Sequence, residues 1–310
     1  MRIRVLGSGA GGGFPQWNCS CHNCAAVRAH APGFRARTQS SLAVSRDGDR
    51  WLLLNASPDL GEQIRSSPSL GARPDVGPRN SPIKAVVLTN ADIDHVAGLL
   101  TLRESQAFSI LANQRVLDVL SGNPVFNVLA RDKVARVAMA MDEATAVKGA
   151  GEELGLVVQM FEVPGKVALY LEDASAGASL GTQPGDTVGL RIEDAESGNA
   201  FFYVPGCAQI DARLASRLRG ATLVFFDGTL WSDDEMVRQG LLGKTGARMG
   251  HVNVSGESGS MAGFAGINVG RKVFIHINNS NPLLDETSPE RAEAEAAGWE
   301  VAYDGMELSL

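Results

Sequence analysis

The chain has 310 residues, which is long enough for one large domain or two small ones. Its net charge of −7, from 28 basic and 35 acidic residues, argues against a nucleic-acid-binding surface. The hydrophobic fraction of 44% is ordinary for a globular protein, and no apolar run reaches the roughly 18 residues of a membrane span. The N-terminal segment MRIRVL is predicted to be a first β-strand and not a signal peptide, so we expect a cytoplasmic protein.

The predicted elements alternate short apolar strands with short helices, a pattern typical of α/β folds. In the first part of the chain, strands are predicted over residues 3–6, 40–45, 51–54, 83–88 and 108–111. Helices are predicted over residues 24–30, 60–66, 96–106 and 113–120. Residues 67–82 contain four prolines and are predicted to form a loop.

The same alternation continues toward the C-terminus. Strands are predicted over residues 154–163, 167–171, 187–192, 200–204, 223–226, 273–277 and 299–303. Helices are predicted over residues 210–218, 233–240, 258–265 and 289–297. Residues 173–186, rich in Ala, Gly and Ser, are expected to form a flexible loop or a lid. Without a repeat or a long linker, we expect one α/β domain over residues 1–310, arranged as a four-layer αβ/βα sandwich.

A glycine-rich loop follows the first strand. Gly7, Gly9 and Gly12 have the spacing of a dinucleotide-binding fingerprint, but that motif requires a helix to begin at the loop. Phe14 and Pro15 follow instead. We therefore interpret the loop as a tight turn that brings the backbone close to a neighbouring segment.

The stretch VVLTNADIDHVAGLL, residues 86–100, places polar groups where a buried strand gives way to a helix. Asp92, Asp94 and His95 follow the apolar run at once. In α/β proteins the carboxyl ends of strands carry the chemistry. We therefore expect Asp94 and His95 to converge on one point at this turn.

This stretch resembles the metal-binding signature of the metallo-β-lactamase superfamily, His-x-His-x-Asp-His before a helix, and the resemblance implies the four-layer fold of that superfamily. Asn90 and Asp92 stand where the pattern has its first two histidines, and Asp94 and His95 stand where it has its last two ligands. Members of the superfamily normally hold two metals. The resemblance implies that this chain keeps the second metal site and has lost the first.

Three of the five histidines, His95, His251 and His276, lie at or near predicted strand ends. His276 ends an apolar strand, as the last metal-binding histidine of the superfamily does. With Asp94 and His95 it makes two imidazoles and one carboxylate, the ligand set of non-haem Fe(II) oxygenases. Asp92 either adds a second carboxylate to this iron site or caps the following helix.

Two further positions bear on the missing first site. The region of the superfamily's third histidine corresponds to residues 163–165, Val-Pro-Gly, and offers no ligand. The metal-bridging aspartate corresponds to Gly206 or Cys207, and Cys207 is either an inert buried thiol or a group that faces the pocket. Because a binuclear hydrolase needs both metals, a single-metal reaction is favoured over hydrolysis.

His251 and Asp227 are predicted to support the chemistry without binding the metal. Nucleases of the superfamily use a histidine in a related position as a proton donor, so His251 is interpreted as an acid or base near the metal. The alternative is an ordinary hydrogen-bonded loop histidine. Asp227 ends a predicted core strand and is expected to orient a metal-binding histidine.

Cys19, Cys21 and Cys24 form a Cys-x-Cys-x-x-Cys cluster after the first strand. Three thiolates at this spacing are typical of a structural zinc site, and in a cytosolic chain they indicate metal binding more than disulfides. A tetrahedral site needs a fourth ligand. His22 and Asp304 are both candidates, and Asp304 would tie the C-terminal turn to the N-terminal loop.

The motifs GGGFPQWNC and HINNSNP narrow the resemblance to a family that makes the cofactor pyrroloquinoline quinone (PQQ). The resemblance implies an iron-dependent, O2-dependent hydroxylase that acts on the tyrosine ring of a cross-linked Glu–Tyr intermediate derived from a short peptide. Such a substrate carries several carboxylates. Its candidate cationic anchors are Arg35, Arg37, Lys244 and Arg248.

Two alternatives remain open. One is a metal-dependent hydrolase of the superfamily, and the other is a non-catalytic carrier that helps to export the finished cofactor. We expect no nucleic acid and no membrane among the partners. The oligomeric state stays open, with a homodimer as one option.

Overall fold

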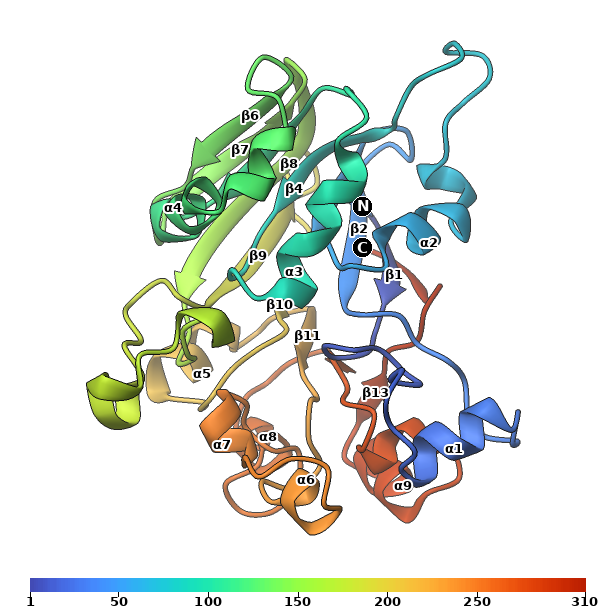
Figure 1. Ribbon diagram of the computed structural model, residues 1–310, viewed down its shortest axis with the longest axis vertical. Helices are drawn as coiled ribbons and strands as arrows, with labels where there is room; N and C mark the ends of the chain where they lie inside the picture. Colours follow the sequence, from blue (N-terminus) through green and yellow to red (C-terminus); the bar gives the residue numbers. More distant parts are fainter.

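A computed structural model describes residues 1–310, apart from the side chain of Ala178. Two seven-stranded sheets lie face to face, and helices lie on the outer side of each sheet (Figure 1). This arrangement confirms the predicted four-layer αβ/βα sandwich. In the described part of the chain, none of the helices is both long and apolar enough to cross a membrane.

The first sheet has the strand order β14-β1-β2-β3-β4-β5-β6. Its strands are β1 (Arg2–Gly7), β2 (Ser41–Ser45), β3 (Trp51–Leu54), β4 (Ile83–Val87), β5 (Phe108–Ala112), β6 (Val134–Ala138) and β14 (Glu307–Ser309). β3 to β6 pair in parallel, and the other neighbours pair antiparallel. Because β14 pairs with β1, the two termini lie together, and the Met1 ammonium donates to the carbonyl of Leu310 over 2.7 Å.

The second sheet has the strand order β13-β12-β11-β10-β9-β8-β7. Its strands are β7 (Ala144–Gly149), β8 (Glu152–Glu162), β9 (Val188–Asp194), β10 (Ala200–Val204), β11 (Leu223–Asp227), β12 (Arg271–Ile275) and β13 (Trp299–Val301). β10 to β13 pair in parallel, and the other neighbours pair antiparallel. Both sheets are therefore mixed, and the parallel strands are β3 to β6 in the first sheet and β10 to β13 in the second.

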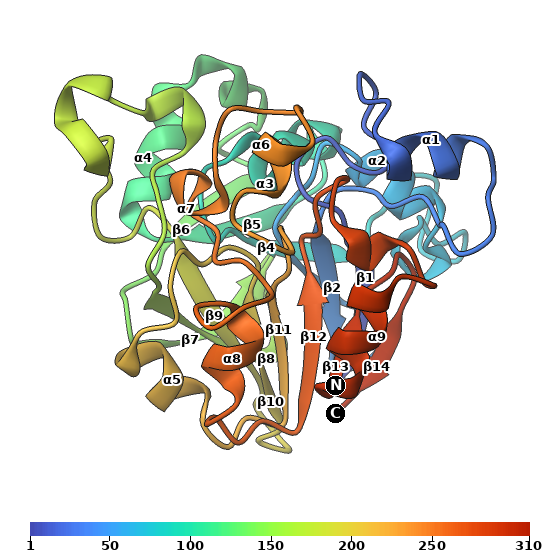
Figure 2. The ribbon, with the colours of Figure 1, turned by 90° about the horizontal axis from the view of Figure 1, so that it is seen from below.

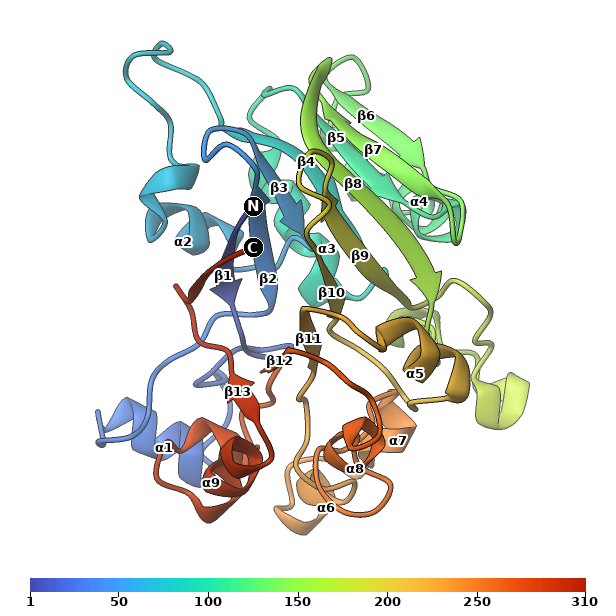
Figure 3. The same ribbon diagram turned by 180° about the vertical axis from the view of Figure 1, so that it is seen from behind.

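The helices bury their apolar faces against the two sheets (Figures 2 and 3). The α-helices are α1 (His22–Arg28), α2 (Leu60–Arg65), α3 (Ile93–Val96), α4 (Gln114–Gly122), α5 (Ala212–Leu218), α6 (Glu235–Arg238), α7 (Gly246–Met249), α8 (Ser260–Phe264) and α9 (Pro289–Ala296). The 3-10 helices are η1 (Pro68–Leu70), η2 (Ala97–Leu102), η3 (Pro124–Val128), η4 (Leu169–Leu171), η5 (Ala174–Ser179) and η6 (Pro282–Leu284). Leu60, Leu99 and Val116 pack on the first sheet, and Leu214, Phe264 and Ala294 pack on the second.

The space between the sheets is filled by apolar side chains from both inner faces. Phe201, Phe225 and Val273 of the second sheet belong to the same buried cluster as Val5 and Leu42 of the first. Each such side chain contributes about 1.5–3 kcal/mol by its burial. This core fixes the relative position of β4, β11 and β12, whose carboxyl ends carry the polar residues of interest.

Two predicted elements differ clearly in the structure, and three strands were not predicted. Residues 169–171, in the predicted strand 167–171, form the 3-10 helix η4, because Val167 and Ala168 are buried while the backbone turns to contact the loop between β4 and α3 (residues 88–92), called the metal loop below. The helix predicted over residues 96–106 begins earlier, at Ile93, and continues as η2. β6, β7 and β14 were not predicted, since their side chains are mostly exposed and leave a weak apolar pattern.

Candidate metal centre

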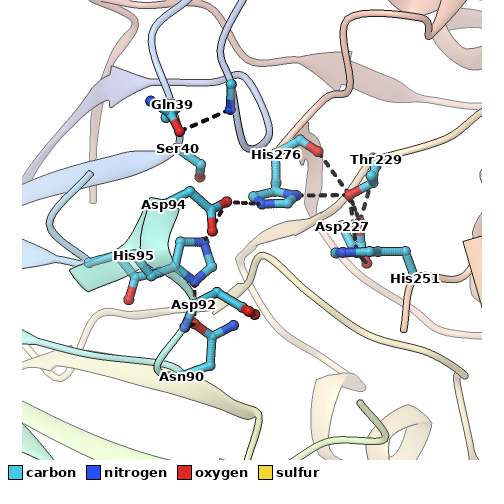
Figure 4. Close-up of polar contacts among 12 residues, drawn as sticks. Gln39, Ser40, Asn90, Asp92, Asp94, His95, Asp227, Thr229, His251 and His276 are labelled. Carbon is cyan, nitrogen blue, oxygen red and sulfur yellow. Dashed lines mark hydrogen bonds and ion pairs between the residues drawn. The ribbon is translucent and has the colours of Figure 1, made fainter. Parts of the chain in front are cut away.

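Asp94, His95 and His276 converge at the carboxyl ends of β4 and β12 (Figure 4). His276 Nε2 lies 3.0 Å from Asp94 Oδ2, and His95 Nε2 lies 3.9 Å from the same oxygen. One ligand atom of each residue lies within 4.8 Å of the other two. The structure thus brings together three of the residues predicted to hold the catalytic metal, from segments that are far apart in the sequence.

The first turn of α3 presents Asp94 and His95 on neighbouring positions of one helical turn, so both side chains reach the same point. The turn that follows β3 holds this helix in place. The amide of Ala56 donates to the carbonyl of His95 over 2.7 Å, and the amide of Gly98 donates to Ala56 over 2.9 Å. A Cβ on Gly98 would lie 2.0 Å from the carbonyl oxygen of Ser57, so this close approach requires glycine.

The glycine loop after β1 holds the other side of the site. Ile277 exchanges backbone hydrogen bonds with this loop, donating to Ser8 and accepting from Ala10, both over 2.9 Å. His276 itself has a φ of +60°, a left-handed conformation that costs free energy in a non-glycine residue. A Cβ on Gly11 would lie 3.4 Å from Asp94 Oδ2. The loop therefore acts as the close-approach turn that its sequence predicted, and it borders the metal ligands.

Hydrogen bonds on the far side of each imidazole fix which ring nitrogen faces the site. His95 Nδ1 donates to Asn90 Oδ1 over 2.7 Å, and that oxygen also accepts from the amide of Asp92 over 3.0 Å. His276 Nδ1 donates to Thr229 Oγ1 over 2.8 Å. Both rings thus direct Nε2 toward Asp94. Outer hydrogen bonds of this kind orient metal-binding histidines in proteins.

His95 Nε2 is buried and has no hydrogen-bond partner among the described residues. An unpaired buried polar atom costs about 1–3 kcal/mol. The lone pair points toward a carboxylate and a second imidazole, neither of which offers it a proton in good geometry. A cation bound by all three side chains satisfies this atom, so the residues present fit a metal ion.

Burial and charge set the protonation of these groups. Burial would raise the pKa of Asp94, but the imidazoles of His95 and His276 hold it below its usual range. Burial lowers the pKa of His95 to about 4. Burial would also lower the pKa of His276, but its hydrogen bond to Asp94 raises it. His276 Nε2 thus shares a hydrogen bond with Asp94 at the point where a cation would bind, and metal binding would displace the proton of that hydrogen bond.

Asp227 and His251 form a second pair beside the triad. Asp227, at the end of β11, is buried and accepts a hydrogen bond from His251 Nδ1 over 2.7 Å. It also accepts from the hydroxyl of Thr229 over 2.6 Å and from the amide of Cys207 over 2.8 Å. The His251 ring stacks on His276, with centroids 5.2 Å apart. Asp227 therefore orients His251 directly and His276 through Thr229.

A cavity of about 420 Å³ opens beside the triad. Its size is within the usual range for small-molecule sites. Besides the triad, the described residues that line it include Asp92, Lys166, Leu169, Glu172, Thr229, Leu242, Lys244, Arg248, Met249 and His251. His251 contributes to the wall, so its Nε2 is available to a molecule bound next to the metal site.

The three cysteines of the N-terminal loop lie together, with their sulfur atoms within 4.8 Å of one another. Asn279, three residues after His276, places its Nδ2 atom 3.1 Å from Cys19 Sγ and 3.3 Å from Cys24 Sγ. Its carbonyl accepts from Asn23 Nδ2 over 3.1 Å. The cysteine cluster thus packs against the segment that carries His276. The contribution of Asn279 was not predicted, although it lies in the HINNSNP motif.

Comparison with known proteins agrees with this geometry. A sequence model described as a beta-lactamase superfamily domain matches residues 50–277. The coenzyme PQQ synthesis protein B of Methylorubrum populi is 52% identical over 310 residues, and that of Xanthomonas oryzae pv. oryzae is 51% identical over 312 residues, each match covering 100% of both chains. The chain belongs to the PQQ synthesis protein B family of the beta-lactamase superfamily.

Superposition on solved structures shows the same fold. The crystal structure of a zinc-bound PqqB from Methylobacterium extorquens superposes with a TM-score of 0.92 at 50% identity, over 100% of both chains. A diphosphatase of the PhnP family superposes with a TM-score of 0.68 at 20% identity, over 99% of this chain and 97% of that one. The second likeness concerns the fold alone. The expected metallo-β-lactamase fold is confirmed.

Asp92 is not part of the triad. It lies at the N-cap position of α3, but its side chain makes no capping hydrogen bond. Its Oδ1 accepts instead from the backbone amide of Leu169, over 3.3 Å. The structure therefore places Asp92 in the pocket wall, where it holds η4, and supports neither of the two predicted roles.

Asp304 does not reach the cysteines, which corrects its assignment as a zinc ligand. Its two oxygens accept from the amide and the hydroxyl of Ser8, over 3.0 and 2.8 Å, and from those of Thr38, over 2.6 and 2.7 Å. The carboxylate thus joins the C-terminal turn to the loop after β1 through hydrogen bonds. His22 is exposed and packs edge-on against Phe34, and it is not in the cysteine cluster either.

At the positions where the ligands of the first metal site are expected to be missing, the residues make other contacts. Cys207 is buried, and burial raises the pKa of its thiol, which contacts the carbonyl of Gln209 over 3.1 Å. It therefore fits the inert buried thiol of the two alternatives. A Cβ on Gly165 would lie 2.4 Å from Thr187 Oγ1, so that segment is packed tightly against the residue that precedes β9.

The four candidate cationic anchors separate into two pairs. Lys244 and Arg248 line the pocket. Arg37 is buried elsewhere, where it donates to the carbonyl of Ala302, and Arg35 pairs with Glu286 over 2.9 Å. Lys166 also lines the pocket and was missed. The sequence feature that could have identified Lys166 is its position directly after Pro164 and Gly165, which follow β8.

Proposed function

We propose that this chain is a mononuclear iron(II) hydroxylase of PQQ synthesis. Its substrate is the cross-linked Glu–Tyr intermediate, and its reaction is O2-dependent hydroxylation of the tyrosine ring. Membership in the PQQ synthesis protein B family supports the pathway. The observation that carries the chemistry is the triad of Asp94, His95 and His276, with both Nε2 atoms aimed at one point.

Two histidines and one carboxylate with open positions form the ligand set of iron(II) oxygenases. When bound, iron(II) at this triad supplies the activation of O2. Each hydroxylation places one oxygen atom on the ring, releases the other as water and consumes two electrons from an external reductant. Asp94, His95 and His276 would be the ligands that this chain supplies to the ion, because Asn90 and Asp92 make other contacts.

His251 and Asp227 handle a proton. The Nδ1 proton of His251 is held by Asp227, so His251 Nε2 presents a lone pair toward the pocket. A tyrosine ring placed beside the metal can transfer its phenolic proton to this atom, which raises the electron density of the ring. Asp227 acts as a positioning residue, since it contacts His251 and Thr229 and lies outside the pocket lining.

The cysteine cluster is proposed to hold a structural zinc ion. Cys19, Cys21 and Cys24 have the spacing and proximity of a closed thiolate site. A related PqqB is described as zinc-bound. In this chain the metal would link the N-terminal loop to the segment after β12, and so stabilise the position of His276.

The experiment is anaerobic loading of metal-stripped protein with Fe(II), followed by addition of the cross-linked Glu–Tyr compound and a reductant in air. Mass spectrometry should show that the product has gained oxygen, and isotopically labelled O2 should supply it. His276→Ala should abolish the gain, whereas His30→Asn, at an exposed histidine, should not. Absence of oxygen gain in the iron-loaded protein would refute the hydroxylase.

A second candidate is a binuclear hydrolase, and one observation favours it. Asp227, His251 and His276 also bring ligand atoms within 4.8 Å of one another, so His276 is shared between two possible sites. Against it, Asp227 already accepts hydrogen bonds from His251, Thr229 and Cys207. Turnover of the same compound without oxygen, with two metals bound outside the cysteine cluster, would favour this candidate.

A further inference from the structure

Three cationic side chains converge on Glu172 in the wall of the pocket. Arg248 donates to Glu172 Oε2 over 2.9 Å, and Lys166 Nζ lies 3.2 Å from Oε1. Lys244 Nζ lies 3.9 Å from Oε2. All four side chains line the same cavity as the metal triad. The hydrogen bond from Arg248 lowers the pKa of Glu172 to about 2, so the carboxylate is ionised.

Positive charge exceeds negative charge in this cluster. One carboxylate faces three cations, although a single bidentate arginine is enough to satisfy a carboxylate. The Glu172 side chain is only 12% exposed, whereas those of Lys244 and Arg248 are 33% and 37% exposed. The cluster thus has the composition of an anion site whose ligand is at present a side chain of the chain itself.

The segment that carries Glu172 is weakly attached to the rest of the molecule. In η4, Leu169, Tyr170 and Leu171 are exposed by 59%, 43% and 40%, so little apolar burial holds them. Two hydrogen bonds connect η4 to the metal loop, from the amide of Leu169 to Asp92 and from the hydroxyl of Tyr170 to the carbonyl of Ala91. Local opening of such a segment requires little free energy.

Two of the three cations belong to segments that have contacts outside η4. The stem of Lys166 lies against Gly250, where a Cβ would be 2.8 Å from Lys166 Cγ. Arg248 belongs to α7, whose first turn is capped by Thr245. Departure of Glu172 would therefore leave three cations on the wall of the cavity that the metal triad also lines.

We propose that Lys166, Lys244 and Arg248 form a binding site for a carboxylate group of the substrate, and that Glu172 occupies this site until the substrate displaces it. The inference rests on the proposed function for the identity of the substrate, whose glutamate portion supplies the carboxylates. The exchange moves η4 away from the pocket, so one event both binds the ligand and opens the wall.

The test is calorimetric titration with glutarate, a dicarboxylate that matches the glutamate side chain. It needs neither O2 nor reductant. Glu172→Gln should bind glutarate about tenfold more tightly than the unaltered protein, because a charged hydrogen bond is worth roughly one such factor. Arg248→Gln and Lys166→Gln should bind it about tenfold more weakly. The neutral diamide glutaramide should not distinguish these proteins.

The control is Glu162→Gln, which removes one negative charge from β8 outside the pocket. It should leave the affinity for glutarate unchanged. Equal tightening in Glu162→Gln and Glu172→Gln would mean a general charge effect and would overturn the proposal. Equal affinity in the unaltered protein, Glu172→Gln and Arg248→Gln would overturn it as well.

Hydrogen exchange on the unaltered protein tests the displacement without any substitution. Glutarate should accelerate exchange at the amides of residues 169–173, since Glu172 leaves its partners. Unchanged or slower exchange there would exclude displacement. These results test the carboxylate site separately from the proposed function. A protein without hydroxylase activity can still bind glutarate, and a hydroxylase can lack affinity for glutarate.

Discussion

His95 donates its Nδ1 proton to the side-chain oxygen of Asn90 over 2.7 Å, at a position where the superfamily signature has a metal-binding histidine. A residue at a position of the first metal site in the signature thus orients a proposed ligand of the second. The backbone amide of Asp92 donates to the same oxygen and fixes the orientation of the amide group. In the proposed site, Asn90 therefore serves as the partner of a ligand in place of being a ligand.

Substitution of Asn90 tests this relationship. Asn90→Ala removes the acceptor for His95 Nδ1, so the ring loses its preferred tautomer and orientation. We expect the affinity of the triad for a divalent metal to fall by roughly 10- to 100-fold, measured by competition with a chelator. Asn90→Asp keeps an acceptor and should retain most of the affinity. Equal affinities in Asn90→Ala and the unaltered protein would show that the hydrogen bond does not order the ligand.

His251 should affect turnover without affecting the metal. His251→Ala removes the proton acceptor in the pocket wall, and turnover should fall by about 10²- to 10⁴-fold. Iron content should stay the same, because the triad itself is intact. The rate of His251→Ala should also recover as the pH rises, since the phenol of the substrate then ionises without help. A loss of iron in this variant would instead identify His251 as a ligand.

Gly98 should be essential for the position of α3. A Cβ at this residue would lie 2.0 Å from the carbonyl oxygen of Ser57, which is part of a packed turn and cannot move freely. Gly98→Ala should therefore lower the free energy of unfolding by about 3 kcal/mol. Gly122→Ala is the matched control, because no described atom beyond its chain neighbours and the backbone of its own helix lies within 4 Å of its Cβ position. Denaturant unfolding of both variants gives the comparison, and similar stabilities would contradict the packing argument.

Asp304 should contribute to stability and not to zinc binding. Asp304→Asn weakens the charged hydrogen bonds from Ser8 and Thr38, and we expect a loss of about 2 kcal/mol in the free energy of unfolding. The zinc content should remain that of the unaltered protein. Cys24→Ala should lose the zinc of the cysteine cluster, as elemental analysis would show. Zinc loss in Asp304→Asn would restore Asp304 as a ligand.

The triad could be predicted from the sequence because its residues follow apolar strands. Asp94 and His95 come after β4, and His276 comes after β12. The carboxyl ends of such strands gather at one edge of a fold of this type. The cysteine cluster was accessible for a different reason, since its three ligands lie within one short loop and their spacing alone brings them together.

Contacts between segments that are distant in the sequence could not be predicted in this way. Asp304 and Asn279 both lie near the C-terminus, and only the folded chain shows that the first reaches Ser8 and the second reaches the cysteines. The cluster around Glu172 joins residues that precede β9 to residues that follow β11. Residues 167–171 have the apolar pattern of a strand, but tertiary contacts with the metal loop decide their conformation.

The most direct measurement is crystallography of iron-loaded protein with anomalous scattering at the iron absorption edge. We expect one iron peak outside the cysteine cluster, bonded to Asp94, His95 Nε2 and His276 Nε2. A peak held by Asp227, His251 and His276, or two peaks that share His276, would contradict the proposed mononuclear site.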